Sequence, residues 1–242
     1  NSVPLVRRGD ASGYEGTIPQ GHYGVVVCNP DGINLDLSMN KGYAEARAAA
    51  RSSVSSKGAA GVISQPGNLY GTGEKEVIAT ATVGKTIVLT PVCLIKEVIL
   101  NIRIEGGGEV SVVSGELSGI SPEVCIPTGK PCEGKYASVC FPAEAAGINR
   151  YTATLSLFGI RLEEAGTSVP ACLSLTIEQK DGQSFVSHTD VTDQMNEAVT
   201  NGLATRIELD LTVRPLETGG YTIELTAWRQ GTAETEGTAG TE

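Results

Sequence analysis

Residues 207–213 read Ile-Glu-Leu-Asp-Leu-Thr-Val, and the strict alternation of apolar and polar side chains in this stretch decides the fold. A period of two predicts a β-strand with one face on a core and the other in water. With shorter apolar runs, this pattern predicts seven or eight strands after residue 91. The stretches that share the clear alternation are 98–104, 151–158, 172–177 and 221–228. We therefore predict antiparallel sheets that stack as a sandwich.

Glycine and proline divide the N-terminal part into shorter elements. The apolar run 23–28 is closed by Asn29-Pro30-Asp31-Gly32, where Pro fixes φ and Gly allows a positive φ. The Ala- and Ser-rich residues 41–60 fit either one short helix or a weak strand followed by a loop, and we favour a loop with one turn of helix. Further strands are predicted at 33–37, 62–63, 76–83 and 85–90, the last two joined by a tight turn at Gly84.

Three segments of the C-terminal part interrupt the strand pattern. Gly106-Gly107-Gly108 is interpreted as a flexible hairpin turn, because it joins two strands and precedes no helix that could cradle a phosphate. The Gly-broken residues 114–119 indicate a bulge or a turn. Residues 192–197 fit one helical turn capped by Thr189 or Asp190.

Length and charge together indicate two domains and a tail. The chain has 242 residues, which suits one large β domain or two of ordinary size. Residues 1–90 carry 8 basic and 7 acidic side chains, whereas residues 91–242 carry 10 and 21. We predict an N-terminal domain at 1–90 and a C-terminal domain at 91–230. The low-complexity residues 231–242 are expected to be a disordered tail.

Composition excludes several classes of partner. The net charge is −10 and no Lys/Arg cluster is visible, so neither a nucleic-acid backbone nor an anionic membrane surface is an expected partner. No apolar run approaches the length of a membrane span. Because no signal peptide precedes the polar start at Asn1, we expect that a targeting segment has been trimmed from a secreted protein.

The six cysteines fit disulfides or free thiols better than a metal site. Their spacing is irregular, no Cys-x-x-Cys pair occurs, and the chain has two His, so we expect no zinc. An even number of cysteines suits disulfides in an oxidising compartment. However, Cys28, Cys93, Cys140 and Cys172 lie in apolar strands, where a free buried thiol is ordinary. Cys125 and Cys132 flank a Pro/Gly turn and are the best local pair.

We assign a catalytic role to no residue of the sequence, and we predict no cofactor and no metal. Nucleophilic catalysis needs a base beside the nucleophile, but His22 and His188 stand alone in the sequence. Glu163-Glu164 is interpreted as part of a solvated loop. The segment Asp190–Asp193 lacks the ligand spacing of a calcium loop, so helix capping explains it better. Arg8-Gly9-Asp10 matches the integrin-binding tripeptide, but a match of three residues often occurs by chance.

Five segments stand out in order along the chain: 21–29 (GHYGVVVCN), 65–71 (QPGNLYG), 89–94 (LTPVCL), 115–121 (GELSGIS) and 189–194 (TDVTDQ). Together they resemble the FimB/Mfa2 group of fimbrial anchor and fimbrillin-associated proteins of Bacteroides-type bacteria. The resemblance covers about residues 20–230, and the set is more specific than any one motif.

This resemblance implies the fold and the role. It implies two transthyretin-like β-sandwiches, export as a lipoprotein and attachment to the outer membrane through a lipidated Cys. The chain departs from the pattern because it has no N-terminal Cys. Either that residue was trimmed or this protein is not lipidated.

We therefore expect a non-enzymatic cell-surface protein, an anchor or minor subunit of a fimbria that acts in adhesion. Its expected partners are fimbrial subunits or other surface proteins, which it would meet by β-strand addition at a sheet edge. The alternative is an outer-membrane lipoprotein that binds glycan or host protein. One Trp and three Phe provide few aromatic surfaces for stacking on sugars.

Overall fold

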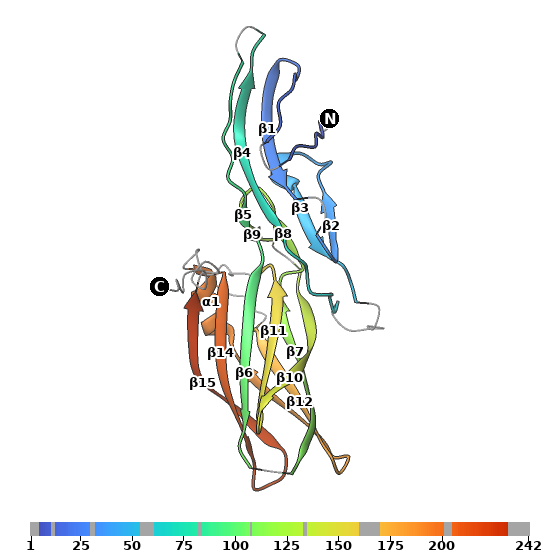
Figure 1. Ribbon diagram of the computed structural model, residues 1–242, viewed down its shortest axis with the longest axis vertical. Helices are drawn as coiled ribbons and strands as arrows, with labels where there is room; N and C mark the ends of the chain where they lie inside the picture. Colours follow the sequence, from blue (N-terminus) through green and yellow to red (C-terminus); the bar gives the residue numbers. More distant parts are fainter. Residues whose placement is uncertain are drawn as a thin grey trace, which may run out of the picture.

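A computed structural model describes residues 5–10, 13–29, 32–53, 61–81, 84–106, 108–132, 135–159, 170–200 and 205–231. The molecule is elongated, with an upper body built mainly from the N-terminal strands and a lower body built from the C-terminal strands (Figure 1). Residues 232–242 and Glu163-Glu164 lie outside the described residues, so the predictions for the tail and for that loop stay predictions.

The lower body is one eight-stranded sheet in the order β13-β12-β7-β10-β11-β6-β14-β15. Its strands are β6 (Lys96–Ile104), β7 (Val110–Ile120), β10 (Ala137–Gly147), β11 (Arg150–Leu157), β12 (Cys172–Gln179), β13 (Ser184–Asp190), β14 (Arg206–Pro215) and β15 (Tyr221–Gly231). Helix α1 (Thr192–Thr200) connects β13 to β14. The two edge strands β13 and β15 approach each other, because the Phe185 and Tyr221 rings meet edge to face at 5.2 Å. The sheet is therefore curled almost into a closed barrel.

The upper body contains two smaller sheets. The three-stranded sheet has the order β1-β4-β5, and the four-stranded sheet has the order β2-β3-β8-β9. Their elements are β1 (Gly21–Cys28), β2 (Leu35–Ser38), the 3₁₀ turn η1 (Tyr43–Glu45), β3 (Arg47–Ala50), β4 (Tyr70–Ala79), β5 (Val92–Cys93), β8 (Glu123–Cys125) and β9 (Lys130–Pro131). Strands β8 and β9 come from the C-terminal side of residue 90, yet β8 pairs with β3. The domain boundary at residue 90 stays a prediction.

The predicted alternation becomes the core of the lower body. Along β14, Ile207, Leu209 and Leu211 are buried while Glu208 and Asp210 face outward. Strand β6 repeats the pattern, with Leu100 and Ile102 buried between partly exposed neighbours. Removal of these side chains from water is the main favourable contribution to folding. The prediction of an all-β chain is confirmed, since α1 is the one α-helix among the described residues.

The prediction of purely antiparallel sheets is wrong at one place. Strands β6 and β14 run parallel, with Arg206 opposite Glu97 and Val213 opposite Ile104. A parallel pair needs a long crossover between its strands, and here residues 105–205 provide it. Alternation along a strand predicts which face is buried but not the direction of its neighbour.

Two predicted local elements are also wrong. Gly106–Gly108 does not form a hairpin, because the strands it joins, β6 and β7, are separated in the sheet by β10 and β11. The strand predicted at 85–90 is absent: residues 84–91 form no regular strand, and β4 pairs on that side only with Val92 and Cys93 of β5. A strand needs a partner for its backbone groups, and local propensity does not supply one.

The bulge predicted within residues 114–119 is confirmed, although β7 continues through it. Ile120 lies opposite Ala137 and Leu117 opposite Val139, so three steps on β7 match two on β10. Gly119 has φ +75, and a Cβ there would lie 2.6 Å from the carbonyl oxygen of Pro170. A glycine is needed at this position for both reasons.

The predictions for the start of the C-terminal helix and for residues 41–60 can also be compared with the structure. The backbone N–H of Thr192 donates to Asp190 Oδ1 at 2.8 Å, so Asp190 satisfies a donor at the start of α1, as the capping prediction required. Within residues 41–60, the favoured turn of helix is η1, but it is followed directly by β3, which the weak-strand alternative had covered.

Leu100→Ala is predicted to lower the free energy of unfolding by about 2–5 kcal/mol, because Leu100 is fully buried in a central strand and its loss leaves a cavity. Urea denaturation monitored by circular dichroism measures the change. The control is Val112→Ala in β7, whose side chain is 46% exposed and whose loss should cost less than about 0.5 kcal/mol. Equal losses for both variants would contradict this account of the core.

Candidate subunit interface

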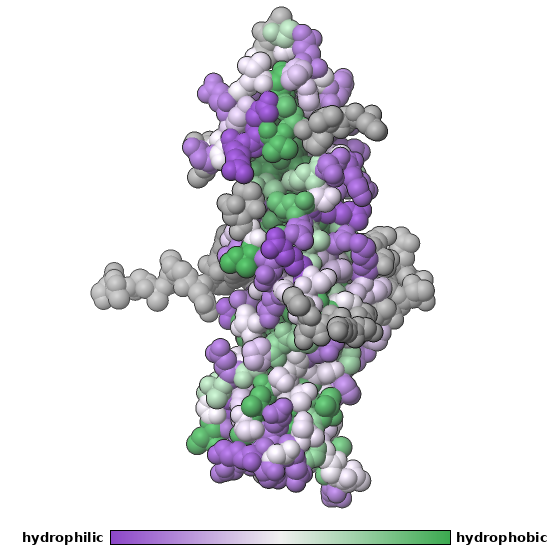
Figure 2. Space-filling model, turned by 90° about the vertical axis from the view of Figure 1, so that its right-hand side faces the viewer, coloured by the Kyte–Doolittle hydropathy of each residue, from purple (hydrophilic) through white to green (hydrophobic). Residues whose placement is uncertain are grey.

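Exposed apolar side chains gather in the upper body. Among the described residues, fifteen large hydrophobic side chains are exposed, and eleven of them lie between residues 5 and 92. Figure 2 shows a hydrophobic band down the upper half of one face. By contrast, of the twelve largest fully buried side chains only Leu69 precedes residue 93. Contiguous exposed apolar surface of this kind marks interaction sites.

Strand β1 is a free sheet edge in this apolar region. It pairs with β4 along its length, and the sheet order leaves its other side without a strand among the described residues. Its eight residues, Gly-His-Tyr-Gly-Val-Val-Val-Cys, include no Lys, Asp, Glu or Pro. Natural edge strands usually carry such residues to prevent pairing with another chain. The β1 edge lacks this protection.

Close packing around two glycines holds β1 in place. A Cβ on Gly24 would lie 2.6 Å from the Tyr43 Cβ, and a Cβ on Gly73 would lie 2.9 Å from the Tyr43 Cε2. The Tyr43 side chain of η1 therefore rests in a notch that only glycines leave open. Val26, one residue before Val27, packs against the core. The strand is thus fixed from one face while Val27 stays 38% exposed.

Asn29 locks the end of β1 to the start of β4. Its Oδ1 accepts from the Tyr70 backbone N–H at 2.6 Å, and its Nδ2 donates to the Asn68 carbonyl at 3.0 Å. The segments 21–29 and 65–71, noted separately in the sequence, therefore meet here. Their shared role is to close the β1–β4 pair.

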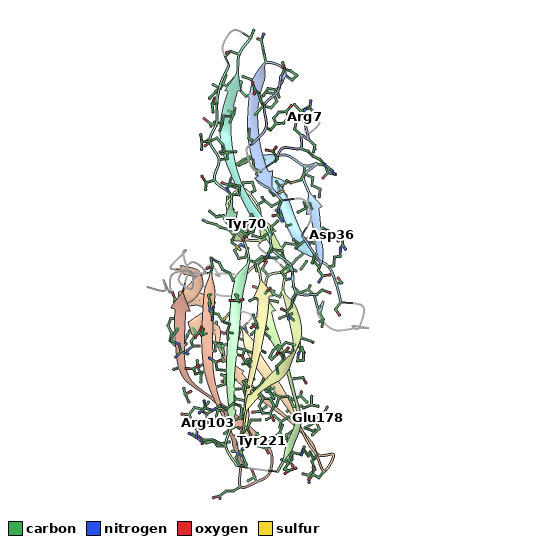
Figure 3. The ribbon with its side chains drawn as sticks, viewed as in Figure 1. Arg7, Asp36, Tyr70, Arg103, Glu178 and Tyr221 are labelled. Carbon is green, nitrogen blue, oxygen red and sulfur yellow. The ribbon has the colours of Figure 1, made fainter. Side chains whose placement is uncertain are left out.

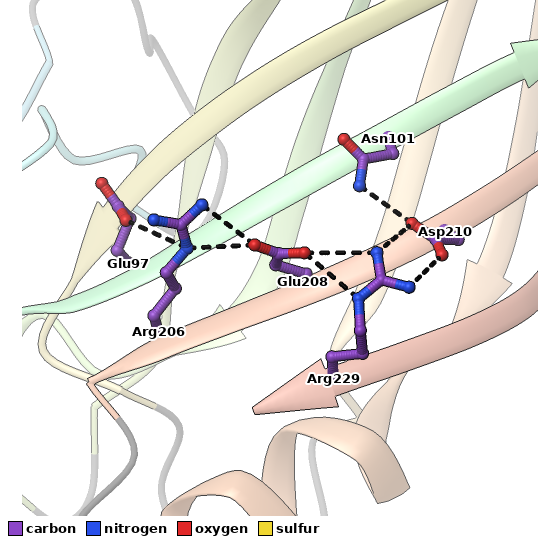
Figure 4. A network of polar contacts seen from close by, with 6 residues as sticks. All are labelled: Glu97, Asn101, Arg206, Glu208, Asp210 and Arg229. Carbon is purple, nitrogen blue, oxygen red and sulfur yellow. Dashed lines mark hydrogen bonds and ion pairs between the residues drawn. The ribbon is translucent and has the colours of Figure 1, made fainter. Parts of the chain in front are cut away.

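The outer face of β6, β14 and β15 has the opposite character. Glu208 accepts from both Arg206 and Arg229, and Arg229 also pairs with Asp210 at 2.9 Å (Figure 4). Asn101 donates to Asp210 at 2.8 Å. Exposed ion pairs contribute little to stability, but a face on which the charges already have partners is suited to water. This part of the lower body is a poor subunit interface.

The structure gives His188 a partner that sequence reasoning missed. Its Nδ1 lies 2.7 Å from Ser174 Oγ, across the β12–β13 pair. Register extends the row through Glu116 on β7 to Cys140 on β10, along a surface hollow of about 550 Å³. Glu116 lies on the far side of Ser174 from His188, so it cannot orient the imidazole as a catalytic acid would. The Ser174–His188 pair therefore has a base beside a hydroxyl, as nucleophilic catalysis requires, but it lacks the third group that would orient the base.

The other candidate residues stay separate. His22 is exposed on β1 of the three-stranded sheet, whereas His188 lies on β13 of the eight-stranded sheet. Arg8, Gly9 and Asp10 are exposed, and Asp10 and Gly13 exchange two backbone hydrogen bonds of 3.1 and 3.2 Å. In the part of the chain that the structure describes, no three His, Cys, Asp or Glu side chains are placed to share a metal. No described helix is long and apolar enough to cross a membrane.

The suggested Cys125–Cys132 disulfide is wrong, because all six cysteines are free thiols. Cys125 lies opposite Lys130, whereas the Cys132 N–H donates to the Glu123 carbonyl, so the two thiols are diagonal on the β8–β9 pair. Diagonal neighbours are about 7–8 Å apart, beyond the Cα separation of an ordinary disulfide. Burial raises the pKa of the Cys132 thiol, which keeps it protonated near neutral pH.

Comparison with known proteins shows the fold. No family model and no curated protein sequence matches the chain. Among solved structures, the fimbrial anchor protein Mfa2 from Porphyromonas gingivalis matches with a TM-score of 0.57 at 10% identity, over 85% of this chain and 74% of that one. The chain has an Mfa2-like fold. The resemblance inferred from the sequence is confirmed at this level.

Two further structures share the Mfa2-like fold. A candidate adhesin from Bacteroides ovatus matches with a TM-score of 0.59 at 18% identity, over 87% of this chain and 77% of that one. A candidate polysaccharide-binding protein from Bacteroides thetaiotaomicron matches with a TM-score of 0.53 at 12% identity, over 90% and 79%. At these identities the matches show a common fold.

The thiols provide a test of this geometry. We predict that the intact mass corresponds to six free cysteines, and that under native conditions maleimide modifies the exposed Cys140 first and the buried Cys132 last. Mass spectrometry of timed samples measures the order. Cys140→Ser should remove the first adduct and leave the later ones. A mass two units lower than expected for thiols would reveal a disulfide and contradict the structure.

Proposed function

We propose that this chain is a non-enzymatic structural protein of a bacterial fimbria, an anchor or minor subunit that acts in adhesion. The observation that carries the proposal is the unprotected edge of β1 in the apolar upper body. The fold shared with a fimbrial anchor and with a candidate adhesin supports it.

Association would proceed by addition of a strand from a neighbouring subunit to β1. The incoming strand would satisfy the backbone N–H and C=O groups on the free side of β1, and its apolar side chains would cover exposed ones such as Val27. Both contributions are available without any movement of the β1–β4 pair. No charged side chain on β1 would have to be desolvated.

The finer points of this proposal rest on the family resemblance. We propose that the two bodies represent transthyretin-like sandwich domains, divided near residue 90, and that the protein is held at the outer membrane by a lipid. The exchange of β8 and β9 into the upper body means that the two parts would form one unit rather than independent beads.

A second candidate function is glycan or host-protein binding at the cell surface. The structural match to a candidate polysaccharide-binding protein favours it. Electron microscopy separates the two functions. Fimbriae that vanish, lengthen or shed into the medium when the gene is deleted would support the fimbrial role, and an unchanged fimbrial coat would favour the surface-binding role.

Val27→Lys is predicted to abolish rescue of fimbriae in the deletion strain. The lysine would place an unpaired charge at the edge where a neighbouring strand joins, while the exposed position leaves the monomer folded. Immunogold electron microscopy and capture of subunits by a tagged protein measure the effect. The matched control is Val112→Lys on the lower body, which is also exposed and should rescue fully. Full rescue by Val27→Lys would refute association at β1.

A further inference from the structure

The lower end of the molecule carries a hollow that the fimbrial proposal does not use. It measures about 480 Å³ and lies between the connection that follows β6 and the hairpin that joins β10 to β11. Its lining includes Arg103, Glu105, Ile148, Asn149 and Arg150. Figure 3 places Arg103 near this end, far from the β1 edge. The hollow is open to solvent, and its exposed lining is more polar than apolar.

Two arginines lie side by side at this hollow. Arg150 on β11 lies directly opposite Arg103 on β6, and both side chains project from the outer face of the sheet. Like charges in directly opposed positions destabilise a sheet. On its other side, Arg103 lies opposite Thr212 of β14, so no carboxylate stands next to it in register. The pair is unusual in a chain whose net charge is −10.

The nearby carboxylate of Glu105 is shared between Arg214 and Arg103. Glu105 accepts from Arg214 Nε at 2.9 Å, and this hydrogen bond is the main reason that the pKa of the Glu105 carboxyl lies below its ordinary value. The Arg103 Nε lies 3.5 Å from Glu105, a longer and weaker contact. Arg150 makes no ion pair with any residue that the structure describes. Positive charge is therefore left over at the hollow.

The hairpin between β10 and β11 fixes the shape of the rim. The Asn149 carbonyl accepts from the Ile104 N–H at 2.9 Å, which ties the turn to the end of β6. Asn149 has φ +55, a conformation that asparagine tolerates better than most residues. Ile148 is 93% exposed beside it. The rim thus offers an amide side chain and an apolar contact beside the two guanidinium groups.

We propose that this hollow binds an anionic saccharide through a carboxylate or sulfate group held by Arg103 and Arg150. Planar guanidinium groups match such anions with paired hydrogen bonds. A peptide could not be held there by strand addition, because β6 and β11 are each paired on both sides. This site stands independently of fimbrial assembly.

Calorimetry with three purified probes tests the proposal: a heparin-derived hexasaccharide, a hyaluronan hexasaccharide and neutral dextran. The expected result is binding of one or both anionic probes and none of dextran. Binding of heparin alone would assign the anion as sulfate, and binding of hyaluronan would show that a carboxylate suffices. Failure of both anionic probes to bind, or equal binding of dextran, would overturn the proposal.

Variants locate the binding at the hollow. Arg150→Gln and Arg103→Gln should each weaken binding by about tenfold or more, the loss expected for one charge-assisted contact. Glu105→Gln should tighten it, because the competing carboxylate is removed. The control is Arg51→Gln in the upper body, an exposed arginine paired with Asp36, which should bind as the wild type does. Circular dichroism verifies that each variant is folded.

Two outcomes of the variant series contradict the proposal. Unchanged binding by Arg150→Gln would place the anion elsewhere on the molecule. Binding of polyglutamate that is equally strong and equally lost in Arg150→Gln would make the site one for acidic peptides. Neither result depends on fimbriae, so a failure here is distinguishable from a failure of the fimbrial proposal.

Discussion

The parallel pairing of β6 with β14 is the contact on which the lower body depends. It joins strands more than a hundred residues apart, and each face of the pair has its own chemistry. On the inner face Leu100 lies opposite Leu209, and both are fully buried. One residue further, on the outer face, Asn101 donates to Asp210. A slip by one residue would exchange the two faces, so burial and hydrogen bonding specify the same register.

The sheet edges differ between the two bodies. The lower sheet curls until β13 and β15 meet at the contact of Phe185 with Tyr221, and Gln179 also donates to the Tyr221 hydroxyl at 2.7 Å. Little edge is left for another chain. The upper body is made of small sheets, and exposed apolar side chains lie on its edge strands β1, β2 and β5. This division suits a protein that is stabilised by one body and joined to its neighbours by the other.

The sequence predicts elements well where burial alone decides them. The strands around 98–104, 151–158, 172–177, 207–213 and 221–228 all form near the predicted positions, because each has one face in the core. Prediction from the sequence fails where the pairing with a neighbouring strand determines whether a strand forms. Residues 85–90 have strand-like composition but form no regular strand. Strand β7 continues through Gly115 because it pairs with β10 and β12 there, and a glycine is needed because a Cβ would lie 2.5 Å from the Phe141 ring. The Ser174–His188 contact and the Arg103–Arg150 pair also depend on strand register, which periodicity does not reveal.

The fimbrial role proposed for this chain depends on β1 receiving a strand from a neighbouring subunit. Hydrogen–deuterium exchange of residues 21–28, compared between the isolated protein and fimbriae that contain it, tests this most directly, with residues 207–213 as an internal reference. The account predicts strong new protection of the β1 amides on assembly and little change in β14, whose amides are already in the sheet. Unchanged exchange across β1 in assembled fimbriae would contradict it.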